Sequence, residues 1–298
     1  MTRRSPLLPM LAALTGIALF SLMDATMKAA SLVAGAYSAL LFRALIGTAL
    51  LLPIWRLGGG RWPRAAVLRI HATRALVVSL MALLFFLALV RLPLAEAIAV
   101  SFIAPLFALY LAAVILGERI AVRAVLGSLL GLCGVAVISA GNLFARGLGG
   151  DGQAMGIAMM VGSALLYGWN LILQRQQALL ADPREIAFFQ NLLVGVLFLL
   201  AAPWCAGWPR PAAMALIAAA AVLAAVSLML FSWAYARAEA QVLLPFEYTA
   251  FVWAALFGWC FFAEQVSAAT LAGAGLIVAG CLVAVRGAGA THTEQTLL

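Results

Sequence analysis

Two charged side chains stand inside the first long apolar stretch of the sequence. Asp24 and Lys28 lie in the segment LFSLMDATMKAAS, residues 19–31. Their spacing of four residues puts them on one face of a helix, about one turn apart. A carboxylate and an ammonium in an apolar environment can recognise opposite charge. Because charges are costly at membrane depth, such residues usually face the interior of a helix bundle or an aqueous cavity.

Two interpretations of this pair are open. Asp24 and Lys28 can form a structural ion pair, with Lys28 extending to the outer membrane interface. Alternatively, they form an outer gate, or a site that binds the charged ends of an amino acid. Arg43, in the next apolar stretch, can join such a site, or it can pair with Asp24 and hold the first two helices together.

A second polar cluster, with aromatic neighbours, occurs in the segment LLYGWNLILQR. Asn170 and Gln174 are again four residues apart, and Tyr167 and Trp169 lie close by. These residues are candidates for lining a pathway and for binding an aromatic side chain. The alternative is ordinary hydrogen bonding between helices, worth about 0.6 kcal/mol per pair.

A third candidate is the carboxylate of Glu247, in the segment LLPFEYTAF. Acidic residues within membrane spans often serve proton relays, and a carboxylate can also bind a substrate ammonium. Tyr248 beside it is a candidate for an aromatic pocket. The alternative for Glu247 is a stabilising partnership with a donor on another helix.

The composition indicates the environment of these residues. Of 298 residues, 66% are hydrophobic and only 9% are charged, whereas a soluble protein has about 25% charged residues. The chain is therefore expected to be an integral membrane protein in contact with lipid. The net charge of +8 does not indicate nucleic acid, because the basic residues lie between apolar spans. The sequence contains no metal-ligand cluster and no phosphate-binding motif, so neither a cofactor nor an enzyme activity is expected.

Apolar stretches of spanning length predict ten transmembrane helices. Their expected ranges are 7–33, 35–55, 72–90, 93–117, 121–141, 154–178, 184–203, 211–236, 240–263 and 267–286. Most of the 18 lysines and arginines fall on one side of this arrangement. The positive-inside rule then places both termini in the cytoplasm of a bacterium, with the helices in its inner membrane.

The two halves of the sequence are similar. Superposing Glu118 on Glu264 gives an offset of 264 − 118 = 146 residues. The same offset aligns four further pairs: Gly127 with Gly273, Gly134 with Gly280, Asp24 with Asn170, and Lys28 with Gln174. An odd number of helices per repeat inverts the second repeat, and inverted repeats are typical of alternating-access transporters. The expected organisation is a five-helix repeat at 1–141, a loop at 142–152, a second repeat at 153–287 and a cytoplasmic tail at 288–298.

An apolar helix ending in Gly-Glu-Arg (117–119) or Ala-Glu-Gln (263–265), followed by a Gly-rich helix, resembles the EamA repeat of the drug/metabolite transporter superfamily. Within that superfamily the chain is most similar to aromatic amino-acid exporters of the YddG type. The resemblance implies a secondary transporter that exports amino acids, with aromatic ones favoured. The alternatives are export of cationic drugs or other small metabolites, and a scaffold or receptor without transport activity.

Overall fold

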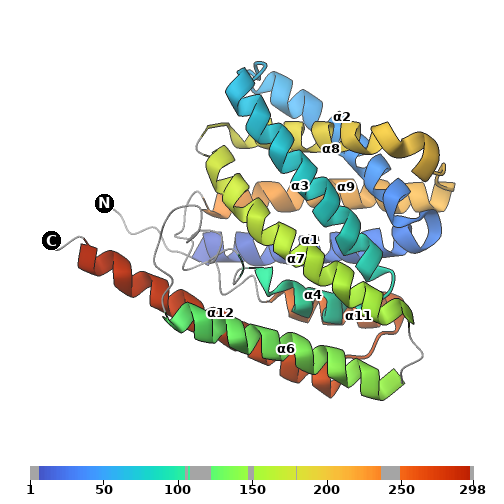
Figure 1. The fold of residues 1–298 in the computed structure, drawn as a ribbon. Helices are drawn as coiled ribbons and strands as arrows, with labels where there is room; N and C mark the ends of the chain where they lie inside the picture. The colour runs from blue at the N-terminus through green and yellow to red at the C-terminus, as the bar shows by residue number, and fades with distance from the viewer. Residues whose placement is uncertain are drawn as a thin grey trace. The chain divides into compact units, whose positions relative to one another are not determined.

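The computed structural model of the chain describes residues 7–104, 107, 122–146, 151–178, 180–235 and 249–295. The described part is helical and contains no strand, which confirms the all-helical class (Figure 1). Its helices are α1 (Leu7–Ala34), α2 (Ala36–Leu57), α3 (Ala65–Leu89), α4 (Leu94–Ser101), α6 (Val122–Arg146), α7 (Asp151–Ala178), α8 (Pro183–Cys205), α9 (Pro211–Tyr235), α11 (Ala250–Phe262) and α12 (Ala268–Gln295).

Six of the described helices are long and apolar enough to cross a membrane. The candidate spans are Leu11–Ala34, Ala36–Leu57, Ala65–Leu89, Gly152–Gln174, Pro183–Cys205 and Pro211–Leu230. Shorter apolar stretches occur in α6, α11 and α12. The chain is therefore a multi-pass membrane protein, while ten spans remain a prediction.

Several helices extend beyond the ranges expected from the apolar stretches. α3 begins at Ala65 rather than at residue 72, and α12 continues to Gln295 rather than ending at 286. The sequence after Pro63 contains good helix formers and no further breaker, so the helix begins directly after this proline. In α12 the helix continues beyond its apolar part, Ala268–Gly280.

The helices repeat with the same offset as the sequence. Adding 146 to the bounds of α3, 65 and 89, gives 211 and 235, the bounds of α9. The same addition takes residue 122, where α6 begins, to residue 268, where α12 begins. The two halves therefore share their secondary structure as well as their sequence pattern.

The chain divides into two compact units, and each contains helices from both halves of the sequence. The first unit comprises Met1–Ser79 and Gln177–Glu264, and the second comprises Leu80–Gln176 and Gln265–Leu298.

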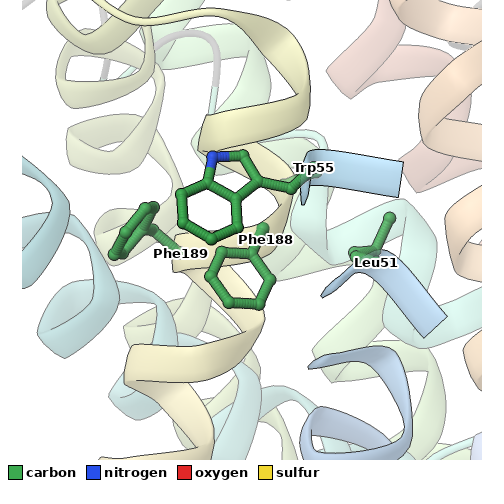
Figure 2. Packing of buried hydrophobic residues seen from close by; sticks show 5 residues of the cluster. Leu51, Trp55, Phe188 and Phe189 are labelled. Carbon is green, nitrogen blue, oxygen red and sulfur yellow. The ribbon is translucent and has the colours of Figure 1, made fainter. Parts of the chain in front are cut away.

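In the first unit, α2 packs against α8 and α1 packs against α9 and α11. The ring of Trp55 on α2 stacks on Phe188 of α8, with centroids 4.6 Å apart (Figure 2). Nearer the start of α2, the Tyr37 hydroxyl donates to the carbonyl oxygen of Phe198. Between α1 and α9, the Ser227 hydroxyl donates to the Gly16 carbonyl at 2.7 Å. Further along, Ala13 of α1 packs against Ala234 of α9. In both helix pairs the contacts join residues in opposite chain order, so both pairs are antiparallel.

In the second unit, glycines allow α6 and α12 to approach closely. A Cβ atom on Gly134 would lie 2.5 Å from the carbonyl oxygen of Gly273, and one on Gly280 would collide with the carbonyl of Gly127. The residue numbers rise along α6 as those of the partners fall along α12, so these helices are antiparallel. α6 and α12 begin 146 residues apart, so these two equivalent helices of the two halves run in opposite directions.

Candidate functional site

The first unit contains buried charges of both signs on helices of membrane length. Asp24 on α1 is 4% exposed, and it interacts electrostatically with Arg43 on α2. The Arg43 Nε atom is buried and has no hydrogen-bond partner in the described part of the chain. The pair therefore joins α1 to α2 and leaves one guanidinium donor unused.

Lys28, one turn further along α1, is paired with a different residue. Its ammonium forms an ion pair with Glu264 and lies 4.9 Å from the centre of the Phe262 ring. Lys28 is 4% exposed, so it does not extend into solvent. The contact links α1 to the end of α11.

The turn after α11 sets the position of Glu264. Ala263 adopts a left-handed conformation with φ 53°, and the Glu264 N–H donates to the carbonyl oxygen of Gly258 at 3.1 Å. Such a left-handed residue commonly ends a helix. The sequence places Glu264 at the end of the repeat, but its pairing with Lys28 depends on tertiary contacts that helical periodicity does not contain.

A further polar residue of the first unit, Gln190, could not be recognised as a site residue from the sequence, because it is only a polar residue within an apolar run. Gln190 on α8 has both polar atoms of its amide buried and unpaired within the described residues. Buried polar groups are nearly always hydrogen-bonded in native proteins. Together with Arg43 Nε, the Gln190 amide supplies hydrogen-bonding capacity that the described part of the chain does not use.

His71 belongs to a buried network that the sequence analysis did not identify. It is 1% exposed, and its Nε2 atom lies 3.1 Å from a Glu185 oxygen. The side-chain amide nitrogen of Gln177 contacts His71 Nδ1, and Arg74 donates to the side-chain oxygen Oε1 of Gln177. Because α3 begins seven residues earlier than expected, His71 lies within a helix rather than in a basic loop.

The polar and aromatic candidates on α7 belong to the second unit. Asn170 is 4% exposed, whereas Gln174 is exposed. Tyr167 and Trp169 are 38% and 42% exposed. The helix therefore presents the two aromatic side chains at its surface and buries one amide.

A buried carboxylate on α4 was also missed from the sequence. Glu96 is 2% exposed, and Gln153 Nε2 lies 3.5 Å from one of its oxygens. It stands in the first turn of α4, where an acidic residue also stabilises the helix N-terminus. Glu247 and Tyr248 lie outside the described residues. Within the described part, no group of three or more His, Cys, Asp or Glu residues could hold a metal ion.

Comparisons with known proteins identify the family. The sequence pattern of the EamA-like transporter family matches residues 7–140 and again residues 154–286. A solved crystal structure is similar in fold, with a TM-score of 0.63 and 23% sequence identity, and the match covers 92% of this chain and 98% of the other. A comparison with proteins of curated function finds no significant match. The two matches together cover most of the chain, which therefore belongs to the EamA-like transporter family, whose members carry small molecules across membranes.

Proposed function

We propose that this transporter exports amino acids, with aromatic ones favoured, across the bacterial inner membrane. The observation that carries the proposal is the buried set of charges on α1, α2 and the end of α11. Asp24 and Glu264 supply two carboxyl groups, and Lys28 and Arg43 supply two basic groups. A zwitterion carries one group of each kind.

A substrate can exchange with the buried ion pairs at a small cost in free energy. A buried ion pair contributes little net stability, because desolvation offsets most of the attraction between the charges. A substrate carboxylate can therefore replace Glu264 beside Lys28, or bind Arg43 Nε, without a large loss. A substrate ammonium can likewise bind Asp24.

The proposed mechanism is alternating access of two inverted repeats, residues 1–141 and 153–287, with both termini in the cytoplasm. The antiparallel contact of α6 with α12 supports the inversion. In this mechanism Asn170 and Gln174 line the pathway on the side opposite to Asp24 and Lys28. Tyr167, Trp169 and Tyr248 bind the aromatic ring of the substrate, and Glu247 binds its ammonium or carries a proton.

Uptake into liposomes tests the proposal. Liposomes containing the purified full-length protein should accumulate labelled phenylalanine or tryptophan above empty liposomes. Asp24→Asn should slow this uptake about tenfold or more, because a hydrogen bond to a charged group is worth about 1.5–3 kcal/mol. Gln174→Ala should slow it as well.

Phe20→Leu is the matched control for the Asp24 variant. Phe20 also lies on α1 but is 45% exposed, so its replacement should leave uptake unchanged. Normal uptake in both the Asp24 and the Gln174 variants would refute the site. Uptake of a cation such as paraquat without uptake of any amino acid would favour export of cations, and no uptake at all would favour the scaffold alternative.

A further inference from the structure

The first unit contains a polar pocket where α2 ends and α8 begins. Its volume is about 240 Å³, and it is lined by Trp55, Gly58, Gly59, Gly60, Arg61, Asp182, Arg184 and Glu185. The candidate span in α2 ends at Leu57, and the one in α8 begins at Pro183. The pocket therefore lies at the boundary of the apolar layer, some distance along α2 from Arg43.

Glycines shape the floor and wall of this pocket. Gly59 has φ 82°, a conformation that favours glycine. A Cβ atom on Gly60 would lie 2.5 Å from the indole nitrogen of Trp55. The loop can therefore fold directly over the indole only because residue 60 has no side chain.

The indole of Trp55 has a hydrogen-bond donor that the described residues do not use. Trp55 is 4% exposed, and its Nε1 atom is buried without a hydrogen-bond partner in the described residues. Figure 2 shows the nitrogen at the edge of the ring away from Phe188. This edge lies against Gly60, which lines the pocket. A buried indole usually finds an acceptor, and a ligand in the pocket would supply one.

The charged groups of the lining are of both signs. The guanidinium groups of Arg61 and Arg184 can donate to an oxyanion, and arginine suits phosphate geometry well. Asp182 accepts the Arg184 N–H at 2.8 Å through Oδ1, and Glu185 contacts His71 through Oε1. Each carboxylate therefore keeps a second oxygen for a cation. Such a lining fits a phosphate joined to a primary ammonium better than it fits a bare anion.

The surroundings favour a lipid as the source of that headgroup. Leu57 is 89% exposed and Trp62 is 67% exposed on the same segment as the pocket. Tryptophan is typical of the membrane interface, and basic pockets at the ends of membrane helices bind lipid headgroups. We propose that this pocket binds the headgroup of a phosphatidylethanolamine-type lipid, with the phosphate at Trp55, Arg61 and Arg184 and the ammonium at Asp182 and Glu185.

Lipid retention tests the assignment on the purified full-length protein. Native mass spectrometry should show retention of phosphatidylethanolamine over phosphatidylcholine, which has no N–H donors, and over phosphatidylglycerol, which has no cation. Arg61→Ala and Glu185→Gln should each weaken retention about tenfold. Glu185→Gln keeps an acceptor for His71, so it changes the charge and preserves the packing.

Arg56→Ala is the matched control, because Arg56 lies over the Trp55 ring, 5.1 Å from its centroid, but does not line the pocket. It should leave retention unchanged. Equal retention of the three lipids, or equal effects of the Arg61 and Arg56 variants, would overturn the proposal. Preference for phosphatidylglycerol with no effect of Glu185→Gln would show an anion site instead. Displacement of the lipid by free phenylalanine would show a substrate site.

Discussion

The ion pair between Lys28 and Glu264 gives the sharpest test of how this protein holds its buried charges. Glu264→Gln removes the carboxylate and leaves the ammonium in place. Removing one partner of a buried pair costs about 3–5 kcal/mol. The Lys28 side chain is 5% exposed and that of Glu264 is 18% exposed, so the lower end of this range applies.

The contact of Lys28 with the Phe262 ring remains in the variant, so it does not enter the difference in stability between the two proteins. The expected loss of stability is therefore about 3 kcal/mol, which lowers the melting temperature of a chain of this size by about 6–12 °C. Adding Lys28→Met to Glu264→Gln should restore part of the loss, because the cation that lost its carboxylate is then removed as well.

Thermal unfolding of the detergent-purified protein, followed by tryptophan fluorescence, measures these changes. Gln265→Ala is the control, since Gln265 is exposed next to Glu264 and its replacement should leave the melting temperature unchanged. A melting temperature of Glu264→Gln equal to that of the wild type would refute the ion pair. So would a double variant whose loss of stability equals the sum of the two single losses, because the two residues would then not interact.

Three further substitutions test packing and hydrogen bonding by the same melting assay. Gly273→Val should lower stability by about 1–3 kcal/mol by forcing α6 and α12 apart, whereas Gly275→Val, with open space around its Cβ position, should cost less; equal effects would contradict the close contact. Tyr37→Phe removes the hydroxyl that donates across α2 and α8 and should cost about 1 kcal/mol, and an unchanged melting temperature would show that this bond contributes nothing. His71→Ala should cost about 2 kcal/mol or more, because Gln177 and Glu185 lose a buried partner, whereas the exposed Thr73→Ala should be neutral; equal melting of these two variants would contradict the network.

The sequence allows much of the fold to be predicted. Helices that cross a membrane need long apolar runs, and a constant offset between similar residues shows that the two halves correspond. The offset of 146 residues carries the bounds of α3 onto those of α9. Helix ends are less predictable, since a helix can continue beyond the apolar part of its sequence, as α12 does after Gly280.

The partners of the buried charges could not be predicted in the same way. Asp24 and Lys28 stand out from the sequence because charge is rare in an apolar run. Whether Lys28 meets Asp24, a headgroup or Glu264 depends on how α1 packs against the end of α11, 236 residues later. The unpaired amide of Gln190 is equally invisible, because a glutamine in an apolar run gives no sign of its neighbours.

The contact between α6 and α12 has twofold symmetry. A Cβ on Gly134 would meet Gly273 and Ile277, and one on Gly280 would meet Gly127 and Gly131, which are the same positions after the offset of 146. This is the pattern of an isologous interface, in which identical patches from two molecules face each other. Two separate chains that each carried one copy of this helix could make the same contact, so joining the halves into one chain would require no new surface here.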